Sequence, residues 1–221
     1  MAARSALLIG ATGLVGGHCL RQLLRDEAYA RVVTLGRRTQ GPDRPGLEQH
    51  AIDFGRLSDY AGLFDAHDVF CCLGTTMRKA GSREAFRLVD FTYQYEAAKL
   101  AAVNGAEQLL LVSSTGASPR SRVFYSRVKG ELEETVRDLP FRAVNLFRPS
   151  LLLGEREESR AGELLAERVL GLASFLLAGP LRKYRPVQAR KVAAAMVRVA
   201  KEGRSGFHVF ESDAVESLGS E

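Results

Sequence analysis

The sequence predicts an α/β fold in which a doubly wound parallel sheet carries helices on both faces. Two observations lead to this fold class. Short apolar and β-branched runs alternate with segments of helical periodicity along the chain. The run over 67–74 is apolar without alternation, which is typical of a strand buried on both faces. The 221 residues suit one domain with a sizeable core, so 1–221 are expected to form a single domain.

The individual elements follow from the apolar runs and from the residues that end them. Ser82 is placed to cap a long helix that stops at Asn104-Gly105. The predicted strands cover 7–9, 31–36, 47–52, 67–74, 108–112, 141–147 and 207–210. One helix is predicted directly after Gly13, and others over 82–103, 123–138, 159–177 and 188–202. Residues from about 150–190 are expected to form a small segment that covers a substrate.

A glycine-rich turn between the first strand and the first helix is the strongest motif. Three glycines follow one another as G-x-x-G-x-x-G. Such glycines let the backbone approach a pyrophosphate, whose charge the N–H groups and dipole of the next helix would hold. The alternative is a glycine-rich turn without a ligand. In this context we interpret the turn as part of a Rossmann-type dinucleotide site. Its residues are Gly10, Thr12, Gly13, Leu14, Val15 and Gly16.

The end of the second predicted strand indicates which dinucleotide is bound. NAD sites usually have an acidic residue there, which holds the ribose 2′-hydroxyl. This chain has Arg37 and Arg38 instead. Guanidinium groups suit a 2′-phosphate by charge and by geometry, although a solvated arginine pair at the start of a loop is the alternative. The sequence therefore favours NADP(H) over NAD(H).

Two later strand ends are also expected to reach the cofactor. Asp53 follows the third predicted strand, where it would meet the adenine amino group or else form a turn. The turn Leu73-Gly74-Thr75 follows the fourth strand. Gly74 permits a close approach, and the Thr75 hydroxyl can bond a phosphate or a ribose.

The candidate catalytic residues follow the fifth predicted strand. Ser113 and Ser114 end that strand, and Tyr125 and Lys129 lie four residues apart in the next helix, so they share one face. An ammonium near a phenol favours the phenolate and helps the tyrosine exchange a proton with an alcohol or a carbonyl. A serine hydroxyl beside it can orient the substrate oxygen.

With these motifs the chain resembles the short-chain dehydrogenase/reductase superfamily over its whole length. Within it, the chain is most similar to the atypical branch of Tat-interacting, CC3-type oxidoreductase-like proteins. The segments that carry this likeness are 71–76, 79–81, 128–131, 147–149, 158–160 and 162–163.

The resemblance implies an NADP(H)-binding fold and assigns roles to its residues. Ser114, or else Ser113, would polarise the substrate oxygen, Tyr125 would be the acid/base, and Lys129 would hold the nicotinamide ribose. Many relatives have an asparagine in the long helix where this chain has Asp90. The resemblance also implies a segment that lines the nicotinamide, made of Arg148, Pro149, Ser150 and Leu151.

Composition narrows the classes of partner and compartment. The net charge of +5 comes from scattered basic residues without interleaved aromatics, so no nucleic-acid partner is expected. The apolar stretch 164–178 is short and charged, so no membrane span is expected. Three cysteines without metal-ligand spacing and four dispersed histidines indicate no metal site. Arg4 and Ser5 lead straight into a strand, so we expect no signal peptide and a cytoplasmic protein.

Three functions are compatible with these motifs. The first is an oxidoreductase that acts on a small carbonyl or alcohol. The second is a regulatory or scaffold protein that binds NADPH without turnover. The third is an isomerase or dehydratase that uses the cofactor transiently. The substrate, the reaction direction and a homodimer through the long helices stay open.

Overall fold

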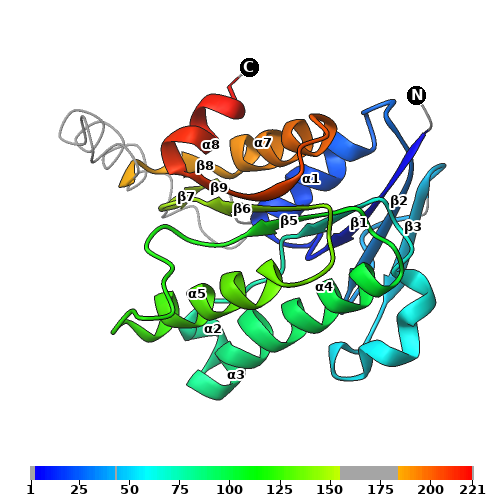
Figure 1. The fold of residues 1–221 in the computed structure, drawn as a ribbon. Helices are drawn as coiled ribbons and strands as arrows, with labels where there is room; N and C mark the ends of the chain where they lie inside the picture. The colour runs from blue at the N-terminus through cyan, green and yellow to red at the C-terminus, as the bar shows by residue number, and fades with distance from the viewer. Residues whose placement is uncertain (1–2, 43, 155–183, 221) are drawn as a thin grey trace.

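The computed structural model describes residues 3–42, 44–154 and 184–220. It confirms the predicted α/β class with a parallel sheet in the strand order β3-β2-β1-β4-β5-β6-β9 (Figure 1). The strands are β1 (Arg4–Ile9), β2 (Tyr29–Gly36), β3 (Leu47–Ala51), β4 (Asp68–Cys71), β5 (Gln108–Val112), β6 (Ala143–Arg148) and β9 (Gly206–Glu211).

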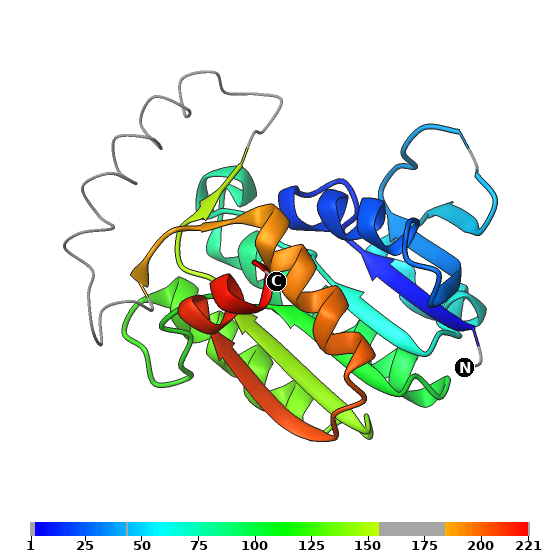
Figure 2. The ribbon, with the colours of Figure 1, turned by 90° about the horizontal axis from the view of Figure 1, so that it is seen from above.

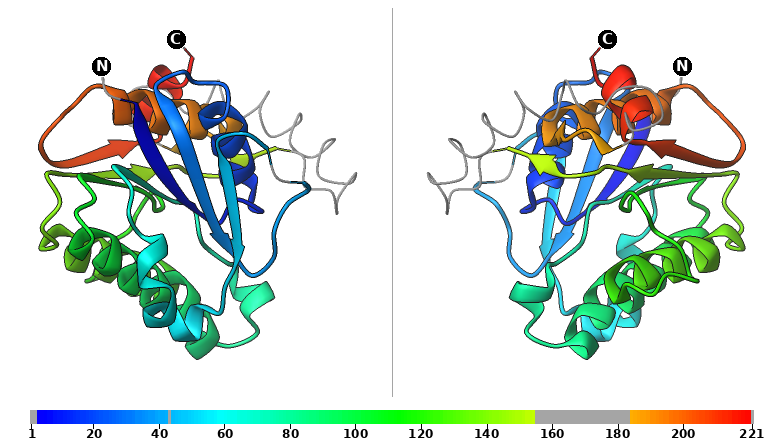
Figure 3. Two further views of the ribbon diagram at one scale, coloured as in Figure 1. Left: turned by 90° about the vertical axis from the view of Figure 1, so that its right-hand side faces the viewer. Right: turned by 90° about the vertical axis from the view of Figure 1, so that its left-hand side faces the viewer.

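Helices cover both faces of this sheet (Figures 1 and 3). One face carries α1 (Leu14–Leu23), α7 (Ala189–Lys201) and α8 (Ser212–Leu218), of which α1 and α7 lie side by side (Figure 2). The other face carries the 3₁₀ helix η1 (Phe54–Leu63), α4 (Tyr93–Val103) and α5 (Phe124–Arg137). The described chain therefore has three layers.

Alternation along the strands divides the interior into two cores. Leu8 and Phe70 pack in the core beneath α1 and α7, whereas Leu7, Ile9 and Val69 pack in the core beneath α4 and α5. Because successive strand side chains point to opposite faces, a strand between two helical layers must be apolar throughout. This explains the unbroken apolar runs in the sequence.

The order of the strands places a crevice at one edge. From β1 the chain proceeds outward to β2 and β3, and it then returns to pair β4 on the other side of β1. Ligands of open α/β sheets bind outside the carboxyl ends of the strands at such a reversal. The ends of β1 and β4 are therefore the place to look for a site.

Several elements differ from the prediction. The helix capped by Ser82 is present but divided into α3 (Arg83–Arg87), a π-helical turn η2 (Leu88–Thr92) and α4. Five elements were not predicted, namely η1, α8, the short helix α2 (Met77–Ala80) and the paired strands β7 (Leu152–Leu153) and β8 (Val187–Gln188). Four of them are too short for their periodicity to be readable. The fifth, η1, is a 3₁₀ helix interrupted by non-helical backbone at Arg56 and Tyr60. The predicted helix 159–177 and most of the predicted substrate-covering segment lie outside the described residues.

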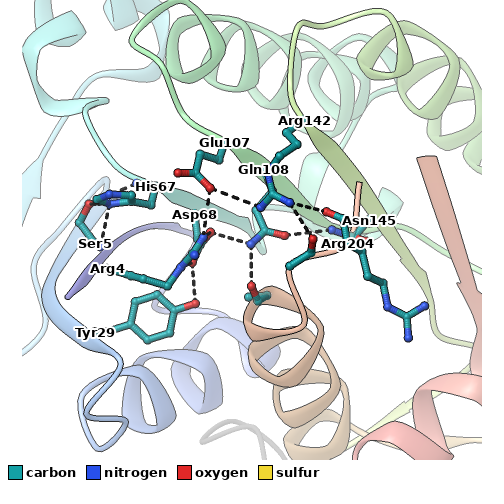
Figure 4. Close-up of polar contacts among 12 residues, drawn as sticks. Arg4, Ser5, Tyr29, His67, Asp68, Glu107, Gln108, Arg142, Asn145 and Arg204 are labelled. Carbon is teal, nitrogen blue, oxygen red and sulfur yellow. Dashed lines mark hydrogen bonds and ion pairs between the residues drawn. The ribbon is translucent and has the colours of Figure 1, made fainter. Parts of the chain in front are cut away.

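The amino ends of the strands are joined by a buried polar cluster around Asp68 (Figure 4). Its carboxylate is fully buried and accepts hydrogen bonds from Arg4 Nε at 2.8 Å, Tyr29 Oη at 2.7 Å and Gln108 Nε2 at 2.7 Å. Because a buried charge must be paired and hydrogen-bonded, these contacts are what keep Asp68 in the interior. The cluster lies at the edge opposite the strand reversal and its crevice.

Candidate functional site

The glycine turn is shaped by contact with the chain itself. Gly10 has φ of +87°, and a Cβ there would lie 2.7 Å from backbone atoms of Cys72 and Leu73. A Cβ on Gly16 would lie 2.1 Å from the carbonyl oxygen of Gly10. The steric need for these two glycines therefore comes from packing of the turn against the end of β4 and against α1.

The amino end of α1 is suited to an anion. The helix begins at Leu14 after Gly13, without a side-chain cap and without an acidic residue in its first turn. The first N–H groups of the helix can therefore donate to a bound anion, which the positive end of the helix dipole would also attract. Val15 is 5% exposed and packs in the core, so it offers only its backbone to a ligand.

A cavity of about 430 Å³ opens at this turn, at the carboxyl ends of β1, β2 and β4. It brings together seven of the predicted cofactor residues from three separate segments of the chain. The lining also includes three residues that were not predicted, Phe54, Gly36 and Cys72, each of which is next to a predicted site residue in the sequence. The lining residues are Gly10, Thr12, Gly13, Gly36, Arg37, Arg38, Phe54, Cys72, Leu73 and Gly74.

Charge in this cavity is positive. Arg37 and Arg38 are exposed, and no described carboxylate forms an ion pair with either. None of the lining residues is acidic. The glycines of the turn, the uncapped helix and the two arginines together suit the phosphates of a dinucleotide.

Asp53 lies outside the group that lines the cavity. Its Oδ1 accepts a hydrogen bond from the N–H of Gly55 at 2.8 Å, and the residue caps η1. This contact corresponds to the turn-forming alternative.

The predicted catalytic lysine forms a buried ion pair. Lys129 Nζ lies 2.8 Å from Asp90 Oδ1, with the side chains 4% and 1% exposed. Burial acts to lower the pKa of Lys129, but the charge of Asp90 and the proximity of Tyr125 outweigh it and raise that pKa above its ordinary value. Lys129 is therefore held as an ammonium.

Asp90 also lies close to a residue that lines the cavity. Its Oδ2 accepts the N–H of Thr75 at 2.8 Å, and a Cβ on Gly74 would lie 3.4 Å from Asp90 Oδ1 and 4.0 Å from Lys129 Nζ. The ion pair thus lies directly behind the wall that Gly74 contributes to the cavity. Asp90 itself lies in the π-helical turn η2, a type of irregularity that is frequent at functional sites.

Tyr125 lies one turn before Lys129 on α5 and is half-buried. Its ring packs against that of Phe86, with ring centroids 5.4 Å apart. Phe86 is fully buried, so it provides a rigid support for the phenol.

The two serines after β5 have different partners. Ser113 is 6% exposed, and its hydroxyl donates to Glu133 Oε1 at 2.5 Å. Ser114 is half-buried, and within the described residues its hydroxyl makes only a long contact of 3.4 Å to the carbonyl oxygen of Thr115. The Ser114 hydroxyl is therefore the one that remains available to a substrate oxygen.

The segment after β6, which is predicted to line the nicotinamide, has polar contacts of its own. The Arg148 guanidinium bonds Glu133 and Glu211 and is absent from the lining of the cavity. The carbonyl oxygen of Pro149 accepts the N–H of Thr115 at 3.0 Å, and the Ser150 hydroxyl donates to the carbonyl oxygen of Arg185. Leu151 is 58% exposed. These four are not among the residues that line the cavity, and neither are Ser114, Tyr125 and Lys129.

Within residues 3–42, 44–154 and 184–220, no group of three or more His, Cys, Asp or Glu side chains could hold a metal ion. In the same ranges, no helix combines the length and the apolar character needed to cross a membrane.

Comparisons with known proteins agree with this geometry. Residues 6–216 match the model of the NAD dependent epimerase/dehydratase family. The chain is 40% identical to Protein HTATIP2 of Rattus norvegicus over 172 residues, which cover 76% of this chain and 71% of the relative. This likeness confirms the resemblance to the atypical, Tat-interacting branch.

A second relative corrects one expectation. Protein FMP52-1, mitochondrial, of Scheffersomyces stipitis is 36% identical over 208 residues, covering 90% of this chain and 88% of the relative. Several fungal relatives carry the same description as mitochondrial proteins. The prediction of a cytoplasmic protein is contradicted by these relatives, since neither composition nor cysteine content specifies a compartment.

Solved structures agree on the fold. MoeE5 in complex with UDP-glucuronic acid and NAD superposes with a TM-score of 0.71 at 17% identity, over 93% of this chain and 75% of that one. At this identity the match shows the Rossmann-type fold alone.

Proposed function

The chain belongs to the NAD dependent epimerase/dehydratase family, and from that premise we propose that it is an NADP(H)-dependent oxidoreductase acting on a small carbonyl or alcohol. One observation carries the proposal. The Lys129–Asp90 pair adjoins the wall of the cofactor cavity at Gly74, and Tyr125 lies one helical turn from Lys129. This arrangement supports a role for the Tyr125 hydroxyl in proton exchange near a bound dinucleotide.

The preference for NADP(H) rests on the cavity's charge. Arg37 and Arg38 line it at the end of β2, where an NAD site would have a carboxylate. Both guanidinium groups lack an ion-pair partner in the described chain, so a 2′-phosphate would add one without displacing another.

The residues of this chain then divide the chemistry among them. When bound, the nicotinamide would supply or accept the hydride. The Ser114 hydroxyl holds the substrate oxygen, and the Tyr125 hydroxyl gives it a proton in reduction or takes one in oxidation. Lys129 would hold the ribose of a bound cofactor and keeps a positive charge near the phenol, while Asp90 holds Lys129 in place.

The test is NADPH consumption against a panel of aldehydes, ketones and quinones, with the Tyr125→Phe variant as the blank. We expect at least one carbonyl compound that the unaltered protein reduces and the Tyr125→Phe variant does not. Equal rates for protein and variant with every substrate would refute it.

The Asp90–Lys129 pair also favours a second candidate, an NADPH-binding regulatory protein without turnover. The carboxylate compensates the lysine charge at 2.8 Å and so weakens its effect on the phenol. NADPH binding in a titration, combined with no consumption over the whole panel, would select this candidate.

A further inference from the structure

A second buried charge network lies on the catalytic helix, away from the Asp90–Lys129 pair. Glu133 is 5% exposed, and its carboxylate accepts the Ser113 hydroxyl at 2.5 Å. Arg148 binds the same carboxylate through Nε at 3.0 Å and through Nη2 at 2.5 Å. Arg148 Nη1 then donates to Glu211 Oε1 at 3.0 Å. The network joins α5 to the carboxyl ends of β5, β6 and β9.

Glu133 lies in line with the proposed catalytic residues. Tyr125, Lys129 and Glu133 are spaced by four residues on α5, so they form a stripe on one side of the helix. The helical rise puts Glu133 about 12 Å along the axis from Tyr125. A contact that anchors Glu133 to the strand ends therefore also limits rotation and sliding of α5 where Tyr125 lies.

The same carboxylate also acts on the serines. Because the Ser113 hydroxyl donates to Glu133, the turn after β5 is held in one orientation. In that orientation Ser113 is buried, while Ser114 keeps its hydroxyl without a short hydrogen bond. Glu133 thus touches both halves of the proposed site, the strand-end serines and the helix of the tyrosine.

A gain in folding stability does not by itself explain why this network is buried. Desolvation of a buried ion pair offsets most of its Coulombic gain, and apolar residues of similar volume often serve stability as well. A bidentate arginine–carboxylate contact instead supplies geometric precision.

We propose that Glu133 is a positioning residue, which through Ser113 and Arg148 sets the placement of Ser114 and Tyr125 on opposite sides of one substrate oxygen. This inference rests on the proposed reductase function. Glu133 touches neither substrate nor cofactor, and it acts through the residues that do.

The test compares Glu133→Gln with Glu131→Gln as a matched control. Glu131 lies on the same helix, is 29% exposed and pairs with Arg87. We expect Glu133→Gln to bind NADPH with unchanged stoichiometry and affinity, and its kcat per bound NADPH to fall about 10- to 100-fold. The deuterium isotope effect measured with NADPH labelled at the transferred position should rise, because misplacement slows the chemical step. The control should match the unaltered protein.

A readout without turnover separates the two proposals. The protein is labelled with ¹³Cζ-tyrosine, and the Tyr125 resonance is assigned by its loss in Tyr125→Phe. We expect that resonance to move in Glu133→Gln and to stay in place in Glu131→Gln. If the unaltered protein reduces no carbonyl, the oxidoreductase function fails, while this resonance still decides whether Glu133 positions Tyr125.

A third variant protects the test against misfolding. Ser113→Ala removes one hydrogen bond and leaves the ion pair with Arg148 intact, so it should shift the resonance and lower kcat in the same direction but less. The proposal would be overturned if Glu133→Gln left both the Tyr125 resonance and kcat per bound NADPH unchanged. If Glu133→Gln does not fold, the same result in Ser113→Ala would overturn it. Glu133 would then be a structural residue only.

Discussion

Replacing Asp90 by asparagine tests the buried ion pair at the centre of the site. Asparagine has nearly the same volume and can still accept the Thr75 N–H, so the change removes chiefly the charge. Lys129 is 4% exposed and would lose its partner at 2.8 Å. Breaking a buried pair in this way costs about 3–5 kcal/mol, because the remaining charge is left uncompensated. For a chain of this size, each kcal/mol lowers Tm by about 2–4 °C, so a fall of roughly 6–20 °C is expected.

The pH dependence of that loss identifies its cause. In the unaltered protein the pKa of Lys129 is raised, so its contribution is fully present at neutral pH and is lost only as pH rises through that pKa. Without Asp90, burial becomes the dominant influence and should depress the pKa of Lys129. A base with a depressed pKa destabilises the fold increasingly as pH falls below its unfolded value, near 10.4. The stability deficit of the variant should therefore be larger at pH 6 than at pH 9.

Urea denaturation at a series of pH values measures this difference. Asp59→Asn is the control, since it breaks the exposed pair with Arg56, in which the aspartate is 47% exposed, and should cost at most about 1 kcal/mol. A deficit for Asp90→Asn that is small and constant with pH would refute the idea of a buried, charged lysine.

Three other changes test separate parts of the molecule. Arg37→Ala should weaken NADPH binding roughly tenfold to hundredfold and leave NADH little changed, because only NADPH has a 2′-phosphate to pair; equal losses in a fluorescence titration would count against the assignment. Tyr125→Phe should retain NADPH affinity and lower kcat by at least about 10²-fold, as seen by NADPH absorbance, and unchanged turnover would remove the phenol from the mechanism. Asp68→Asn should lower the free energy of unfolding by about 1.5–3 kcal/mol in urea without altering NADPH affinity, since its cluster lies at the opposite edge of the sheet; a change in affinity would show that the two edges are coupled.

The parts of the site that the sequence predicted are those encoded by local spacing. Gly10, Gly13 and Gly16 follow a strand and precede a helix, and the structure puts this turn at the edge of the cavity with Arg37 and Arg38. Tyr125 and Lys129 share a helix face because their separation matches one turn. Such patterns depend on a few neighbouring residues, so they can be read without the fold.

The features that escaped prediction depend on contacts between distant segments. The hydrogen bonds of Arg148 to Glu133 and Glu211 form only once β6, β9 and α5 are packed together. Asp90 was noted as a departure from relatives, yet its pairing with Lys129 requires η2 to lie against α5. Phe54, the first residue of η1, lines the cavity together with residues that follow β1, β2 and β4.

Sequence alone determined the class of the fold, the family and the residue types of the dinucleotide site, because periodicity and glycine spacing are properties of single elements. The tertiary structure decided which serine hydroxyl stays available, which carboxylate holds Lys129 and where Arg148 points. Each of these outcomes depends on which buried polar groups form hydrogen bonds or ion pairs with one another. Their outcome depends on distances of a few ångströms between segments that only packing brings together.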